Sequence, residues 1–104
     1  MKSDTLTLIL DKENFAEIEI GKKTEDYRSF SDFYIKRLCN LINDEIDSFK
    51  PFKKVQFFLG YQNSRKSMIF EIKGIWFDTF EKNIPEGFNK GDQAFTIELG
   101  RRIV

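Results

Sequence analysis

The chain has 104 residues, of which 17 are Lys or Arg and 17 are Asp or Glu, so its net charge is zero. This length fits one domain, residues 1–104, which can bury a core without disulfides or metals. Domains that coat long nucleic acid without sequence preference are strongly basic, and this chain is not. Any contact with nucleic acid would have to come from a local patch.

The residue types that are missing exclude several kinds of site. The chain has no histidine, which removes Ser-His-Asp and Cys-His catalytic pairs and histidine-based zinc sites. Its single cysteine, Cys39, allows no intrachain disulfide and is expected to be a small buried apolar residue. We expect no metal and no cofactor. An enzyme built from this chain would have to use Lys, Asp, Glu, Tyr, Thr or Ser.

The sequence also carries an expectation about location. Lys2 is followed by polar residues, and the apolar run after them stops at Asp11, which does not fit a signal peptide. No apolar run approaches the length that spans a bilayer. A lone cysteine suits a reducing compartment, so we expect a cytoplasmic protein without a membrane partner.

The first helices and strands are predicted from the spacing of apolar residues and from residues that begin or end helices. Thr5 to Leu10 alternates leucines with other residues and predicts a strand. Asp11 can cap the helix that follows, and Gly21 stands just past its end as a left-handed terminator. The polar stretch Lys22 to Arg28 is expected to be extended. Ser29 or Ser31 can cap a second helix, which helical spacing extends to about Ile46.

The rest of the chain predicts strands. They cover Val55 to Leu59, Met68 to Phe77, and a last strand around Phe95 to Leu99, with Asp78 to Asp92 mainly as loop. The order is therefore strand, helix, strand, helix and then strands. It indicates an α+β fold with a small mixed sheet or partly closed barrel packed by two helices.

The stretch GKKTEDYR resembles the hallmark of the ASCH domain family, which is Gly, any residue, Lys, two residues, Glu, any residue, Arg. The matching positions are Gly21, Lys23, Asp26 and Arg28, with Asp26 in place of the usual Glu. The segments SFSDFYIKRL, VQFFLGYQNSRKSMIFEIKGI and FTIELGRRIV also look like the family's later elements. The resemblance implies a PUA-like fold, a small mixed β-barrel or curved sheet packed by two helices.

The resemblance further implies that RNA or a nucleotide-like ligand binds in a cleft beside the motif. This sequence departs from the family pattern in two places. Phe58 and Leu59 stand where relatives often have an Arg-Asn pair, which removes polar groups near the cleft. One group of relatives deacetylates acetylcytidine with a Lys, a Thr and a Glu. This chain has Lys23 but carries Asp26 where that group has its Thr, which argues against the same reaction.

One wall of the expected site consists of Lys23, Asp26 and Arg28. Arg28 can bind a phosphate or base edge bidentately, and Lys23 can place a point charge on phosphate. Asp26 can orient either cation or accept from an exocyclic amine such as that of cytosine. Strict strand alternation puts Lys23 on the opposite face, so it joins the wall only if alternation is not yet established at the turn.

The second wall consists of Tyr61, Arg65 and Lys66, where a base can stack on the tyrosine between cations. The residues of both walls could instead have purely structural roles. Asp26 and Arg28 can form an ion pair between strands. Arg65 and Lys66 can serve only to solubilise their loop.

Three functions remain open from the sequence. The first is binding of RNA, single-stranded nucleic acid or a nucleotide by the six wall residues, without catalysis. The second is a small nucleoside amidohydrolase or ribonuclease that uses Lys23 and Asp26. The third is a non-enzymatic protein-interaction module with a degenerate cleft, which zero net charge, Phe58 and Leu59 favour.

Overall fold

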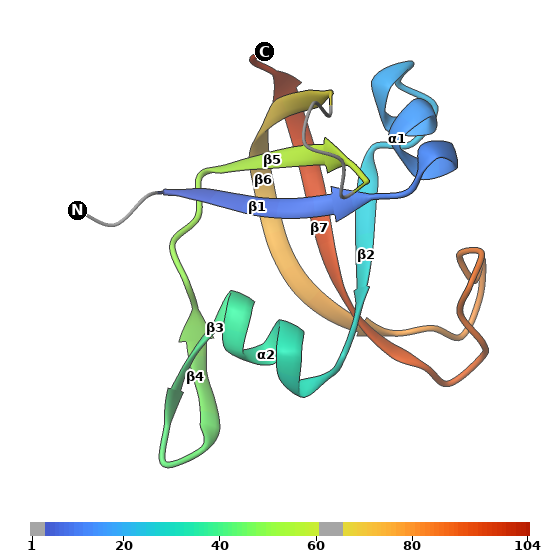
Figure 1. The fold of residues 1–104 in the computed structure, drawn as a ribbon. Coiled ribbons are helices and arrows are strands. Elements are labelled where there is room, and N and C mark those ends of the chain that lie inside the picture. The colour runs from blue at the N-terminus through green and yellow to red at the C-terminus, as the bar shows by residue number, and fades with distance from the viewer. Residues whose placement is uncertain (1–3, 61–65) are drawn as a thin grey trace. The chain divides into compact units, whose positions relative to one another are not determined.

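A computed structural model of the chain describes residues 4–60 and 66–104. Helices and strands follow one another within these residues as β1 (Thr5–Leu10), α1 (Lys12–Glu19), β2 (Glu25–Ser29), α2 (Asp32–Leu38), β3 (Cys39–Ile42), β4 (Glu45–Phe49), β5 (Lys54–Leu59), β6 (Ser67–Thr79) and β7 (Gln93–Arg102) (Figure 1). The predicted α+β class is confirmed. Neither helix in the described ranges has the length and apolar character needed to cross a membrane.

Two sheets contain all the described strands. Five strands form a mixed sheet in the order β1-β5-β6-β7-β2, and β3 pairs with β4 in a separate hairpin. β1 runs parallel to β5, with Leu6 opposite Val55 and Leu8 opposite Phe57, whereas β5 runs antiparallel to β6. The predicted mixed sheet with two helices is therefore confirmed, while the PUA-like barrel stays a prediction.

The chain falls into two compact units. That residues 1–104 form one domain stays a prediction. The first unit comprises Met1–Asp26, Pro51–Gly74 and Glu98–Val104. In it α1 packs on β1 and β5. Its core contains apolar side chains from both helix and sheet, namely Leu6, Leu8, Leu10, Phe15, Ile18, Val55, Phe57, Met68, Phe70 and Leu99. The alternation of β1 places its leucines inside, as the sequence predicted.

Both ends of α1 follow the sequence signals. The side chain of Asp11 accepts a hydrogen bond from the backbone N–H of Asn14 at 2.8 Å, which satisfies one of the unpaired donors of the first turn. A second bond, from the Asn14 side-chain amide to Asp11, measures 3.2 Å. Gly21 lies just past the helix with a φ of +80°, which a residue with a Cβ adopts only under strain.

We expect Asp11→Ala to lower the free energy of unfolding by about 1 kcal/mol, the usual cost of losing an N-cap. Asp11→Ser is the matched control, because a serine hydroxyl can accept the same backbone bond. Urea unfolding followed by circular dichroism measures both midpoints. Equal midpoints for Asp11→Ala and wild type would show that the cap contributes nothing.

The second unit comprises Tyr27–Lys50 and Ile75–Ile97. Its core is built around Phe95, whose ring lies 5.3 Å from Phe30, 6.1 Å from Phe49 and 6.2 Å from Phe77, measured between centroids. The other buried apolar side chains of this unit are Leu38, Cys39, Phe80, Ala94 and Ile97. Aromatic contacts therefore surround Phe95 at the centre of this core.

The predicted length of the second helix was wrong. The helix begins after Ser31, as expected, but it ends at Leu38 rather than near Ile46. The residues that follow form the β3–β4 hairpin, in which Leu41 pairs with Ile46. Its turn consists of Asn43 and Asp44, with φ of 52° and 64°. Asn and Asp tolerate this left-handed backbone, which suits a tight hairpin turn and ends any helix.

Cys39, at the start of β3, is 2% exposed, which confirms that it is a buried apolar residue. Burial raises the pKa of its thiol above the ordinary value, and the nearby positive charge of Lys50 opposes that shift. The thiolate that a reactive cysteine needs is therefore disfavoured at neutral pH.

Candidate functional site

The segment Gly21–Arg28 leaves α1 and becomes an edge strand of the mixed sheet. The backbone N–H of Lys23 donates to the carbonyl of Glu17 at 3.1 Å, and the carbonyl of Thr24 accepts from Leu99 of β7 at 3.0 Å. β2 then runs from Glu25 to Ser29 at the end of the sheet order. The expected extended conformation is confirmed for the part that forms β2. Lys23 and Asp26 belong to the first unit and Arg28 to the second.

Lys23 is held against the first turn of α1. Its Nζ donates to the side-chain oxygen of Asn14 at 2.8 Å. Asn14 in turn donates to the capping residue Asp11, so the ammonium group is positioned through two hydrogen bonds in series. Asn14 was not predicted as a site residue, and its only sequence signal is its place three residues after the cap.

Asp26 is buried, with 3% of its surface exposed. A buried carboxylate is costly unless it is paired, and Asp26 does have an interaction partner. None of the buried side-chain oxygen and nitrogen atoms in the described ranges lacks a hydrogen-bond partner. Asp26 therefore has a structural role whatever else it does, and the alternative that it forms an ion pair between strands stays open.

Arg28 is half-buried and contacts α2 within the second unit. Its Nη1 donates to the hydroxyl oxygen of Tyr34 at 3.1 Å, and its Cζ lies 5.7 Å from the centroid of the same ring. The second distance is within the range of a cation–π interaction. The contact of Arg28 with Tyr34 was not predicted from the sequence.

The second predicted wall is only partly described. Tyr61 and Arg65 lie outside the described residues. Lys66 is exposed, with its Nζ 3.5 Å from Glu19 Oε2 and 6.0 Å from the centroid of Phe15. An exposed ion pair of this kind contributes little to stability. Lys66 and Lys23 thus both contact α1, at Glu19 and Asn14 respectively.

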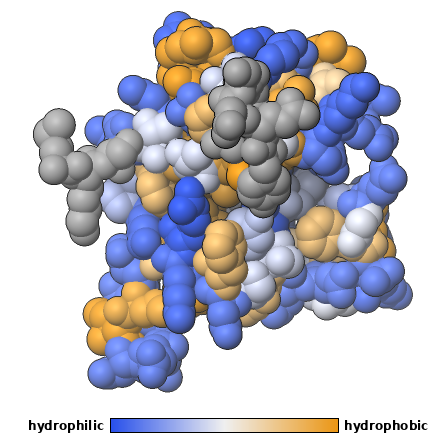
Figure 2. All heavy atoms as spheres, viewed as in Figure 1, coloured by the Kyte–Doolittle hydropathy of each residue, from blue (hydrophilic) through white to orange (hydrophobic). Residues whose placement is uncertain are grey.

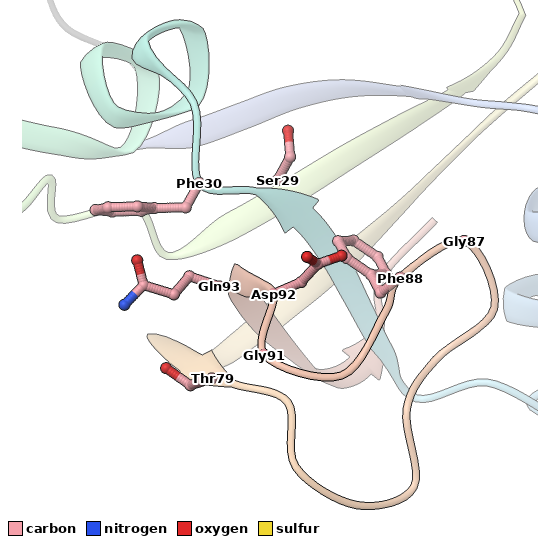
Figure 3. A pocket seen from close by; sticks show the side chains of 8 residues that line it. All are labelled: Ser29, Phe30, Thr79, Gly87, Phe88, Gly91, Asp92 and Gln93. Carbon is pink, nitrogen blue, oxygen red and sulfur yellow. The ribbon is translucent and has the colours of Figure 1, made fainter.

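A hollow of about 540 Å³ in the second unit begins directly after the motif (Figure 3). Its side chains come from the end of β2 and the residue after it, the end of β6, the loop that leads into β7 and the first residue of β7, namely Ser29, Phe30, Thr79, Phe88, Asp92 and Gln93. Two backbone bonds close this loop, from Phe80 N–H to the carbonyl of Asp92 at 2.9 Å and from Gly91 N–H to the carbonyl of Phe80 at 2.7 Å. The sequence predicted only a loop here and missed the hollow.

Apolar side chains are exposed elsewhere in the second unit. The β3–β4 hairpin exposes Leu41, Ile42 and Ile46, and α2 exposes Phe33. Figure 2 shows apolar side chains over the hairpin. Tyr27 is not among them, because its half-buried ring packs edge-on against Phe80 at 5.7 Å.

No family model, curated protein or solved structure matches this chain. Within residues 4–60 and 66–104, no group of three or more Cys, Asp or Glu residues could hold a metal ion. The described residues of the first unit offer a lysine held by Asn14, and those of the second unit offer an arginine held by Tyr34 and a hollow lined by aromatic rings. These groups suit recognition of phosphate and of planar rings.

Proposed function

We propose that this chain binds RNA, single-stranded nucleic acid or a nucleotide through the segment Gly21–Arg28, as an ASCH-like domain with a PUA-like fold. The resemblance of Gly21, Lys23, Asp26 and Arg28 to the family hallmark supports the proposal. The observation that carries it furthest is the position of Arg28, whose guanidinium is both hydrogen-bonded to Tyr34 and placed over its ring.

A guanidinium that is held in this way is suited to an anionic ligand. Arginine offers a planar fork of donors that matches phosphate oxygens, and Tyr34 reduces the number of orientations this fork adopts. A group that is already ordered loses less conformational entropy when a ligand binds. Arg28 would therefore contribute more to binding than a freely moving surface arginine.

Lys23 would contribute a single positive charge to the binding site. Its ammonium group, held by Asn14, would act as a point charge on one phosphate. Because the chain is neutral overall, few phosphates would be engaged, and affinity should fall only gently as salt rises.

The test is a fluorescence anisotropy titration of a labelled single-stranded RNA across a series of salt concentrations. We expect Lys23→Gln to weaken binding and to reduce the slope of log Kd against log salt by about one, the change due to one lost phosphate contact. Lys22→Gln is the matched control, because it makes the same charge change at the adjacent exposed residue.

The slope for Lys22→Gln should remain that of the wild type. Equal slopes for wild type and Lys23→Gln would remove Lys23 from the site. An unmeasurable affinity of the wild type at low salt would end the proposal.

A protein-interaction module is the second candidate function, favoured by the exposed apolar side chains of the second unit. Phe33 is 65% exposed and Ile42 is 58% exposed. Clustered exposed apolar residues commonly mark interaction surfaces. This function becomes the better explanation if the wild-type protein binds no RNA. No specific contact among the described residues favours the hydrolase alternative that would use Lys23 and Asp26.

A further inference from the structure

We propose that the hollow beside the motif is a subsite for a nucleobase that carries an exocyclic amino group, such as cytosine or adenine. The inference rests on the proposed function, because it assigns the base of a ligand whose phosphate Arg28 would bind. Its volume of about 540 Å³ lies within the range of about 300–1,000 Å³ that is usual for small-molecule sites. The residues that carry the inference all belong to the second unit.

Two aromatic rings in fixed positions line the hollow. Phe30 is 36% exposed, and its ring is packed against Phe77 at 5.6 Å and Phe95 at 5.3 Å. Phe88 is packed against Phe80 at 5.2 Å. In Figure 3 the Phe88 ring lies beside Asp92, whereas the Phe30 ring extends to the left, away from Asp92. Rings that are both accessible and held from behind are suited to stacking on a base.

The Asp92 carboxylate supplies selectivity. Its Oδ2 accepts from the backbone N–H of Asn89 at 2.8 Å, and the Asp92 N–H donates to the carbonyl of Asn89 at 3.0 Å. These two bonds hold the carboxylate, which lies beside the Phe88 ring in Figure 3. An ionised carboxylate only accepts hydrogen bonds, so it favours an amino group of a base over a carbonyl.

The remaining groups fit a base better than a phosphate. No lysine or arginine is among the described side chains that line the hollow, so the negative charge of Asp92 would repel a phosphate there. The side-chain amide of Gln93 offers both a donor and an acceptor for a base edge. Its backbone carbonyl accepts a hydrogen bond from the backbone N–H of Phe30 at 3.3 Å. Arg28, the residue before Ser29, would bind the phosphate outside the hollow.

The experiment compares the RNA pentamers UUCUU and UUUUU, which have the same phosphates and differ in one base. We expect the wild type to bind UUCUU about fivefold more tightly, near the lower end for a hydrogen bond that reads a base edge. Asp92→Asn should bring the ratio close to one, because a carboxamide can donate to the uracil carbonyl as well as accept. Asn at this position also keeps an oxygen for the Asn89 N–H, so the loop should remain folded.

Asp44→Asn is the matched control, since it removes the same charge in the β3–β4 turn and asparagine tolerates the φ of 64° found there. It should leave the ratio unchanged. Equal binding of the two pentamers by the wild type, or an unchanged ratio in Asp92→Asn, would overturn the subsite while leaving RNA binding intact. Loss of all RNA binding by the wild type would instead contradict the proposed function itself.

Discussion

Phe95→Ala is expected to lower the free energy of unfolding by about 3–5 kcal/mol, the usual cost of deleting a buried aromatic side chain. Phe95 is 0% exposed, and its ring touches those of Phe30, Phe49 and Phe77. Its removal would take away the ring contacts and leave a cavity where the side chain is now fully buried. Urea unfolding monitored by Trp76 fluorescence and by circular dichroism measures the loss.

Two further variants make the stability prediction selective. Phe33→Ala removes the same side chain from an exposed site of the same unit and should cost less than about 1 kcal/mol. Phe95→Leu keeps much of the volume and provides a measurable midpoint if Phe95→Ala fails to fold. Equal losses for Phe95→Ala and Phe33→Ala would mean that Phe95 is not at the centre of this core.

Arg28→Lys is expected to weaken RNA binding by about tenfold, which corresponds to about 1.4 kcal/mol. The substitution keeps the positive charge but removes the planar fork and its contact with the Tyr34 ring. The loss would therefore measure geometry rather than charge. Tyr34→Phe should give a smaller loss, because it removes the hydrogen bond to Arg28 and keeps the ring.

The control for this series is Arg101→Lys, which makes the same exchange at an exposed arginine that pairs with Glu71 at 3.1 Å. Its affinity for RNA should match that of the wild type. Thermal unfolding of every variant checks that the fold is retained. If Arg28→Lys binds RNA as tightly as the wild type, arginine is not needed as a fork and its contact with Tyr34 is only structural.

The parts of the fold that could be predicted are those set by local signals. The alternation of Thr5 to Leu10, the cap at Asp11 and the left-handed Gly21 each depend on neighbouring residues, and all three are confirmed. The end of α2 could not be predicted from periodicity, because Leu41 and Ile46 have spacings that also suit a helix. The turn at Asn43 and Asp44 was the overlooked signal.

The site was harder to predict because its geometry depends on distant contacts. The hydrogen bond from Lys23 to Asn14 crosses from the strand segment back to α1, and the one from Arg28 to Tyr34 reaches α2. The hollow is lined by residues far apart in the sequence, and a backbone bond joins Phe80 to Asp92 across the long loop beside it. Motif spacing identifies Lys23 and Arg28 as candidates, but it does not show which side chains hold them.

Binding at Gly21–Arg28 is tested most directly by nuclear magnetic resonance. Titrating UUCUU into the isotope-labelled protein at low salt should move the amide signals of Arg28, Phe30 and Asp92 along one saturating curve. The signals of Lys23 and Asp26 should move as well. Saturation that moves only signals of the β3–β4 hairpin, or no change at millimolar RNA, would contradict an RNA site in this segment.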